Sequence, residues 1–271
     1  MRVRLGVAFE GGGVRCAAGL GVLCALEKAG LEPYAYAGCG AGAAVAATGA
    51  CGLAPQACLG RLRRCVRAGR VREGALRTAL EDLFSFAMYG RGRLAIPALD
   101  LETGAPRVYA SMFPVRPDPR PWSRKERLCD ALLAAMAVPG VATPVEIGGR
   151  PLCGGGMLRA LLPQLLFALG AERVLCVRAA GAEEKSAERG KNAQAVRAAV
   201  LFSPAPQRAD WTISVENKCA SVGVLDAHGA DALFEAGYEA AQAMLPLLRA
   251  KRQAPQGMIL SFPGGQLRED G

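Results

Sequence analysis

Two glycine-rich stretches near the start of the chain have the residue types and spacing of catalytic turns. The first, residues 10–15 (EGGGVR), directly follows the apolar run 3–9. Glycines let the backbone approach a ligand closely, and backbone amides aimed at one point stabilise a developing negative charge. The second, residues 38–42 (GCGAG), has the glycine spacing of the G-x-S-x-G nucleophile elbow, a sharp turn from strand to helix. Its central residue, which an elbow lifts into the active site, is Gly40.

The first stretch fits an oxyanion hole better than it fits other anion-binding loops. A dinucleotide fingerprint requires G-x-G-x-x-G, and the third glycine position falls on Cys16. A Walker A loop requires Gly-Lys-Ser/Thr, which does not follow the glycines. An oxyanion hole requires only backbone amides, supplied here by Gly11, Gly12 and Gly13, with Arg15 to hold the loop. A plain tight turn is the structural alternative, and the elbow-like turn after the next strand weakens it.

The surrounding pattern predicts alternating strands and helices that position both turns. We expect strands at 3–9 and 34–37, helices at 17–29 and 41–50, and two arginine-rich helices within 55–83. Later elements are a strand pair in 94–111, a proline-rich loop at 113–123, a helix at 124–136, short strands around 145 and 152, a helix at 161–169, strands at 173–177 and 212–215, and a helix at 231–249. This order predicts a doubly wound or three-layer α/β fold, with a mostly parallel central sheet flanked by helices. We assign residues 1–250 to one domain and 251–271 to a C-terminal tail, and we expect a polar segment at 181–209.

Composition indicates a globular protein of the cytoplasm. The 271 residues are 51% hydrophobic and 21% charged, and we find neither a signal peptide nor an apolar run of membrane-spanning length. The ten cysteines form no C-x-x-C pair, so we expect reduced thiols, no metal site and no cofactor. The net charge of +9 is compatible with an anionic membrane surface, and equally with the arginine-rich usage of a GC-rich genome. Nucleic-acid binding has no motif to support it.

The two turns and their flanks resemble the opening of the patatin-like phospholipases. The matching segments are GVAFEGGGVRCAAGLGVLCALEKAG and AYAGCGAGAAVAA, followed by AMAVPGVATPVEIGGRPLCGGGMLRALLPQLLFALGAERVLCV and GADALFEAGYEAAQAMLPLL. The resemblance implies a three-layer α/β fold and a lipid acyl hydrolase. In that family a G-G-G-x-R loop forms the oxyanion hole, the serine of G-x-S-x-G attacks the ester, and an aspartate acts as its base.

Carried over to this sequence, the resemblance implies that both catalytic positions are vacant. The serine position is Gly40, and the aspartate position is Gly154, or Gly155 if the register shifts by one. The loop of Gly11, Gly12, Gly13 and Arg15 is intact, although Cys16 replaces the glycine that the family usually has next. We therefore expect a pseudo-hydrolase that keeps the oxyanion loop and a pocket for a lipid or an acyl chain.

Two alternatives remain open at this point: an ester hydrolase with another nucleophile, and a non-enzymatic scaffold or partner-binding protein. Cys39 and Cys153 each precede a vacated position. The residue before an elbow nucleophile projects to a different side, so we expect Cys39 to pack in the interior. His228, the only histidine, is expected to be a surface or capping residue.

The segment 59–80 combines arginines with an apolar stripe. Arg61, Arg64 and Arg67 recur at helical spacing, and Leu59 and Leu62 begin the stripe. A basic amphipathic helix of this kind either packs its stripe on the domain or lies on an anionic membrane. We expect packing, with peripheral membrane contact as the alternative. The sequence does not indicate an oligomeric state.

Overall fold

A computed structural model describes residues 3–67, 70–71, 73–84, 92–139, 142–154, 156–179, 209–215, 222–250, 258–261 and 266–268. The strands are β1 (Leu5–Phe9), β2 (Ala35–Gly38), β3 (Val66–Arg67), β4 (Arg70–Val71), β5 (Arg93–Asp100), β6 (Pro106–Ala110), β7 (Trp122–Ser123), β8 (Val145–Ile147), β9 (Arg150–Cys153), β10 (Arg173–Arg178), β11 (Trp211–Ser214), β12 (Met258–Ser261) and β13 (Gln266–Arg268). The α-helices are α1 (Ala17–Lys28), α2 (Gly42–Cys51), α3 (Pro55–Cys65), α4 (Glu73–Phe84), α5 (Leu128–Met136), α6 (Leu162–Ala168) and α10 (Ala230–Arg249). Short 3₁₀ helices are η1 (Gly13–Cys16), η2 (Gly156–Leu161) and η3 (Ala227–Gly229).

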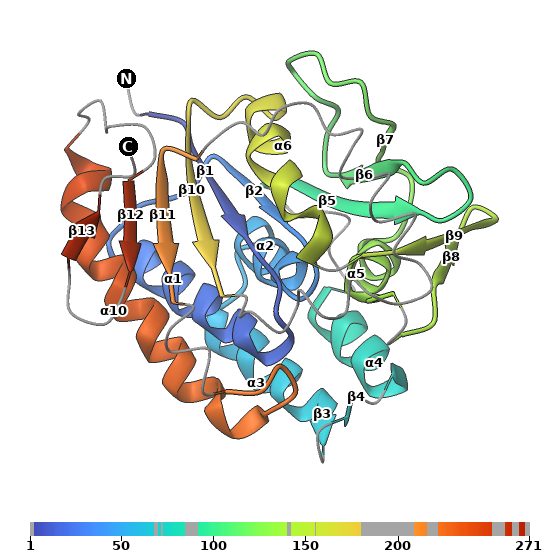
Figure 1. Cartoon of the computed structure of the whole chain (residues 1–271), viewed down its shortest axis with the longest axis horizontal. Helices are drawn as coiled ribbons and strands as arrows, with labels where there is room; N and C mark the ends of the chain where they lie inside the picture. The colour runs from blue at the N-terminus through green and yellow to red at the C-terminus, as the bar shows by residue number, and fades with distance from the viewer. Residues whose placement is uncertain are drawn as a thin grey trace.

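A central sheet organises the molecule (Figure 1). Its strand order is β13-β12-β11-β10-β1-β2-β5-β6-β7, and β9 also pairs with β5 while β8 pairs with β9. The pairs from β12 through β5 are parallel, and β6, β9 and β13 are antiparallel to their neighbours β5, β5 and β12. The predicted mostly parallel sheet is therefore confirmed.

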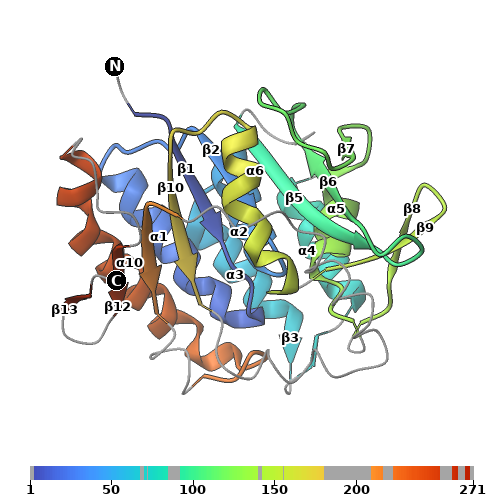
Figure 2. The same ribbon diagram turned by 45° about the horizontal axis from the view of Figure 1, so that its top comes forward.

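Helices cover both faces of this sheet (Figure 2). Along β1, Val7 and Phe9 join one apolar cluster with α1, α2, α5 and α10, whereas Ala8 joins a second cluster with α6. This alternation is the two-residue period of a strand that is buried on both sides. The three-layer α/β fold is confirmed.

Helices α1 and α10 approach each other unusually closely at two glycines. A methyl group at Gly21 would overlap the carbonyl oxygen of Phe234, and one at Gly237 would overlap the carbonyl oxygen of Ala18. The backbones of the two helices are therefore in direct contact, and neither position has room for a side chain.

Most expected elements are present, and two details differ. The helix expected at 161–169 is present as α6, with Pro163 in its first turn and η2 before it. The helix expected at 124–136, however, begins only at Leu128. Part of the segment that we expected to be a polar tail forms β12 and β13 at the sheet edge, where the apolar run 258–260 pairs with β11. Of the polar segment at 181–209, only Ala209 lies within the described residues.

Candidate functional site

The two glycine turns lie side by side because their strands do. Strands β1 and β2 are parallel neighbours, and Phe9 at the end of β1 is paired in register with Gly38 at the end of β2. The carboxyl ends of parallel strands meet at one edge of a sheet, which is where α/β proteins place their sites. The 10–15 loop and the turn at 38–42 therefore emerge together at this edge.

The turn between β2 and α2 has the backbone of a tight elbow. Gly40 has φ of +54°, a left-handed conformation that side chains other than glycine's adopt at a cost. A methyl group at Gly38 would overlap the carbonyl oxygen of Gly42, and one at Gly42 would overlap that of Phe9. The two outer glycines of the motif are thus required by close backbone packing.

The first glycine of the loop touches the elbow directly. A Cβ atom built on Gly11 would lie 2.5 Å from the carbonyl oxygen of Cys39 and 2.8 Å from the Cα atom of Gly40. The structure therefore brings Gly11 and Gly40 together, and the roles that the sequence predicts for them stay predictions.

The rest of the loop is held by the segment that precedes α10. Gly13 has φ of +58°, and a methyl group there would overlap the carbonyl oxygen of Val224. That oxygen accepts a 2.8 Å hydrogen bond from the backbone N–H of Val14. Arg15 is only 1% exposed, and its Nε donates a 2.8 Å hydrogen bond to the carbonyl oxygen of Val222. Arg15 thus ties the loop in place from inside the protein.

The sequence missed this contribution of residues 222–226. Their role rests on main-chain carbonyls, which any residue type could supply, so the sequence held no signal for it. The same segment contains Asp226, whose carboxylate accepts a hydrogen bond from the backbone N–H of His228 and lies 3.3 Å from its Nδ1. The side chain of His228 is fully exposed, in line with the expected surface position.

Gly154, the first candidate for the aspartate position, packs against the end of α5. Its backbone N–H donates a 2.8 Å hydrogen bond to the carbonyl oxygen of Ala137. A methyl group at Gly154 would overlap the carbonyl oxygen of Ala135, so an aspartate does not fit here unless α5 moves. Gly155, the second candidate, lies outside the described residues.

Cys39 and Cys153 are interior side chains. Both belong to the apolar cluster between the sheet and α6, with exposures of 0% and 1%. Burial raises the pKa of the Cys153 thiol to about 11. A nucleophilic cysteine requires the opposite shift, because the thiolate is the attacking form.

We expect iodoacetamide at about pH 8 to leave Cys39 and Cys153 unmodified in the native protein. Burial keeps reagent away from both thiols, and the raised pKa keeps Cys153 protonated until the pH approaches about 11. Peptide mass mapping before and after unfolding in urea checks this, because unfolding should make both thiols reactive. Rapid native modification of Cys39 would contradict the interior placement and revive the cysteine nucleophile.

The raised pKa of Cys153 also makes the free energy of unfolding depend on pH. The thiol ionises near pH 9.0 in the unfolded chain but only near about 11 in the folded protein. The free energy of unfolding is therefore unaffected by this group below pH 9.0 and falls as the pH rises from 9.0 to about 11.

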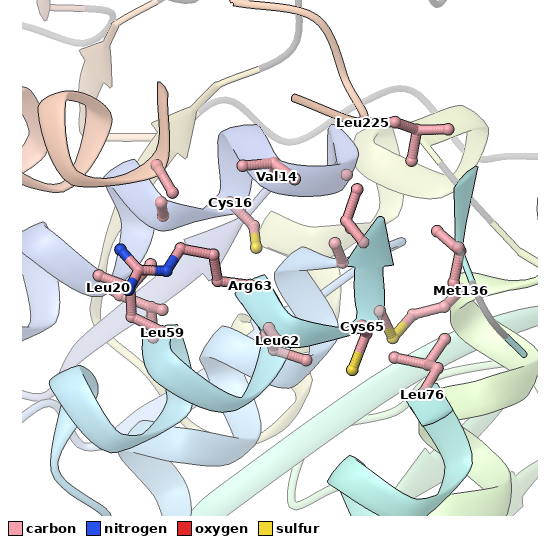
Figure 3. Close-up of a pocket in the computed structure, with 16 residues that line it drawn as sticks. Val14, Cys16, Leu20, Leu59, Leu62, Arg63, Cys65, Leu76, Met136 and Leu225 are labelled. Carbon is pink, nitrogen blue, oxygen red and sulfur yellow. The ribbon is translucent and has the colours of Figure 1, made fainter. Parts of the chain in front are cut away.

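An apolar cavity of about 60 Å³ adjoins the two turns (Figure 3). Gly13 and Val14 from the loop and Ala41 from the elbow form part of its wall. The remaining wall comes from α1, α3, the β3–β4 hairpin, α4, the end of α5 and the start of α10, through Cys16, Ala17, Leu20, Leu59, Leu62, Arg63, Cys65, Val66, Val71, Leu76, Met136, Leu225 and Ala230. An apolar group bound there would lie next to the 10–15 loop.

Helix α3 directs its apolar stripe at this cavity. Leu59 and Leu62 line the wall, while Arg61 pairs with Asp82 of α4 and the guanidinium of Arg63 lies 2.8 Å from Asp231 of α10. The stripe therefore packs on the domain. The side chain of Arg67 lies outside the described residues.

Within the described ranges, no cluster of three or more histidine, cysteine or acidic side chains has the arrangement to hold a metal ion. None of the helices found there combines the length and apolar character needed to cross a membrane.

Comparison with known proteins identifies the family. The model of the patatin-like phospholipase family matches residues 7–166, which include both glycine turns and Gly154. Among solved structures, the fold is similar to the crystal structure of VipD from Legionella pneumophila, with a TM-score of 0.50 and 11% sequence identity over 90% of this chain. The match covers 66% of the VipD chain, slightly under two thirds of its length. No curated protein matches the sequence. The family model spans more than half of the chain, which therefore belongs to the patatin-like phospholipase family.

Proposed function

We propose that this protein binds an acyl group at a patatin-like site that has lost the serine–aspartate hydrolysis of its family. The observation that carries the proposal is Gly40 at the apex of the elbow, where the hydrolase requires a side-chain nucleophile. Gly40 has the left-handed φ of an elbow and touches the oxyanion loop through Gly11. This geometry supports our assignment of Gly40 to the nucleophile position, and glycine carries no attacking atom there.

The aspartate position supports the same conclusion. At Gly154 the end of α5 fills the space that a carboxylate would need. If the aspartate belonged at Gly155, glycine occupies that position as well. Neither register supplies a base, so a serine restored at one position would remain unactivated.

The site nevertheless keeps features that could bind an acyl group without reacting with it, namely an anchored glycine loop and an apolar cavity beside it. Arg15 anchors the loop from the interior, and Gly13 and Val14 pass from this loop into the wall of the apolar cavity. A cavity of about 150 Å³ holds benzene. At about 60 Å³, the cavity here accommodates a short acyl group or the end of a longer chain. We propose that the acyl group occupies the cavity while its carboxyl or ester oxygen faces the loop amides.

We expect the purified protein to show no hydrolysis of p-nitrophenyl butyrate above the buffer blank, because nothing at Gly40 attacks the ester. In contrast, butyrate should bind, which isothermal titration calorimetry measures directly. Leu62→Phe enlarges a side chain that lines the cavity and should weaken butyrate binding about tenfold by overlap. Leu83→Phe makes the same change on α4 outside the cavity and should leave binding unchanged.

The loss of hydrolysis and the binding of an acyl group can each be contradicted independently of the other. Turnover that persists through extensive purification would overturn the loss of hydrolysis, whatever the binding result. Absence of butyrate binding, or equal weakening by Leu62→Phe and Leu83→Phe, would overturn the acyl site.

A further inference from the structure

Exposed apolar side chains gather at the end of the sheet opposite the elbow. Among the described residues, the exposed large hydrophobic side chains are Val3 (41%), Phe113 (57%), Val115 (56%) and Val71 (42%). Val71 lines the cavity near the glycine turns. The other three lie where the parallel strands begin.

The topology places these three side chains at one end. Val3 immediately precedes β1. Strand β6 runs antiparallel to β5, so the chain that leaves β6 returns to the start of β5, where the backbone N–H of Ser111 donates to the carbonyl oxygen of Leu94. The backbone N–H of Val115 then donates a 2.8 Å hydrogen bond to the carbonyl oxygen of Ala168 at the end of α6.

Residues 113–121, the loop that carries Phe113 and Val115, are held by a buried ion pair and its hydrogen bonds. Arg120 and Asp118 are paired there with side-chain exposures of 7% and 4%. Asp118 also accepts a 3.1 Å hydrogen bond from Nε1 of Trp122, and Arg120 donates a 2.8 Å hydrogen bond to Gln164 of α6. Burial opposes ionisation of Asp118, but the hydrogen bonds that it accepts from Arg120 and Trp122 hold its pKa below the usual value. A loop held this firmly does not lose much entropy when it docks.

Arginine side chains lie close to the exposed apolar side chains Phe113 and Val115 and to the neighbouring ring of Tyr34. Arg124 lies over the Phe113 ring at 5.5 Å, and Arg4 and Arg93 lie over the Tyr34 ring at 5.5 and 4.4 Å. The Tyr34 hydroxyl and Val115 flank the same point, Gly170, so the aromatic and aliphatic parts are continuous.

The charges at this end are mostly positive. Arg120 pairs with Asp118, and Arg173 at the start of β10 pairs with Asp210, so these two pairs add no net charge. The other cations near this loop include Arg4, Arg93, Arg116, Arg124 and Lys125, and the other acids include Glu32, Glu126 and Glu172. Glu172 is already paired with Arg4 at 2.9 Å, and Glu126 accepts a hydrogen bond from Ser123. An excess of cations therefore faces solvent around Phe113 and Val115.

We propose that this surface, formed by Val3, Phe113 and Val115 with Arg4, Arg116 and Arg124, docks on an anionic membrane. An apolar tip that enters the region between headgroups and acyl chains, with arginines at the level of the phosphates, is the general arrangement of peripheral membrane contact. The surface lies at the opposite end of the sheet from the elbow, so docking here directs the cavity away from the bilayer. The proposal is independent of whether the cavity binds an acyl group.

Co-sedimentation of the whole protein with vesicles tests this surface. We expect binding to vesicles of phosphatidylcholine mixed with phosphatidylserine, weak binding to phosphatidylcholine alone, and loss of binding as salt rises from about 0.15 M to about 0.5 M. Phe113→Ala combined with Val115→Ala should reduce the partition coefficient about tenfold through lost apolar burial. Arg116→Gln combined with Arg124→Gln should reduce it by roughly tenfold or more, because each cation near the surface contributes about 1 kcal/mol.

The matched variant away from the surface is Arg64→Gln, which removes an exposed arginine near the other end. It should bind like the parent. As a gain of signal, Phe113→Trp should show a blue shift of tryptophan emission with anionic vesicles. Ala105→Trp, at an exposed position between β5 and β6 at the other end of the sheet and outside the cavity wall, should not. The proposal is overturned if the parent protein does not bind anionic vesicles. It is equally overturned if Arg64→Gln weakens binding while the Phe113 and Val115 variants do not, since α3 would then be the membrane face.

Discussion

Gly40→Ser combined with Gly155→Asp should give measurable hydrolysis of p-nitrophenyl butyrate, on the order of 10²-fold above either single variant. The serine hydroxyl would stand at the elbow apex beside Gly11, and the φ of +54° costs serine only about 1 kcal/mol. The single variants should do little because nucleophile and base act as one unit. We expect a rate well below that of a native hydrolase, because the residues around a vacated site no longer support its geometry.

Gly40→Ser combined with Gly154→Asp is the matched control for this restoration. It introduces the same two groups, but the new carboxylate would overlap the carbonyl oxygen of Ala135. We expect this pair to be less stable by thermal unfolding and inactive. If the pair with Gly154→Asp is active and the pair with Gly155→Asp is not, the aspartate position is 154, and α5 must move to make room for the carboxylate. If both pairs stay folded and neither hydrolyses the ester, the assignment of Gly40 to the nucleophile position is wrong.

The parts of the fold that follow from local pattern could be predicted from the sequence. The apolar run before 10–15 and the one before 38–42 are each closed by glycines and followed by a helical pattern, and this combination is specific enough to place both turns on one sheet edge. The strand pair around residues 102–104 follows from its turn residues in the same way. In each case the chain carries its own boundary signal.

What could not be predicted depends on contacts between distant segments. The carbonyl oxygen of Val224 holds the 10–15 loop through the backbone N–H of Val14, and the residue types near 224 give no sign of that contact. The close packing of Gly154 on α5 likewise follows only from where β9 meets the end of that helix. Strands β12 and β13 were missed because a short apolar run surrounded by polar residues predicts a strand only when a sheet edge is known to be free beside it.

The two ends of the sheet now have separate proposed roles, and their chemistry differs accordingly. At the elbow end, the chemistry resides in main-chain groups and small residues such as Gly11, Gly40 and Ala41, with an apolar cavity behind them. At the opposite end, it resides in long exposed side chains such as Phe113 and Arg124. Substitutions at one end should therefore leave the function of the other intact, so the acyl site and the membrane surface can be tested in the same protein.

Gly237→Ala should destabilise the protein by about 3 kcal/mol, although alanine is the better helix former. The added methyl would overlap the carbonyl oxygen of Ala18, so α1 and α10 must separate along a contact that buries Leu20 and Leu233. Urea unfolding measures the change as a lower midpoint with an unchanged slope.

The same substitution at Gly60 should have the opposite sign. Gly60 lies inside α3, and a methyl group there would meet no atom within 4 Å. Only the helix propensity remains, so Gly60→Ala should stabilise the protein by about 1 kcal/mol. The contrast isolates the approach of the two backbones from the intrinsic preference of the residue. If Gly237→Ala proved neutral or stabilising, α1 and α10 would have to lie farther apart than described. The segment from 222 to 230, which holds the 10–15 loop, would then have to shift with α10.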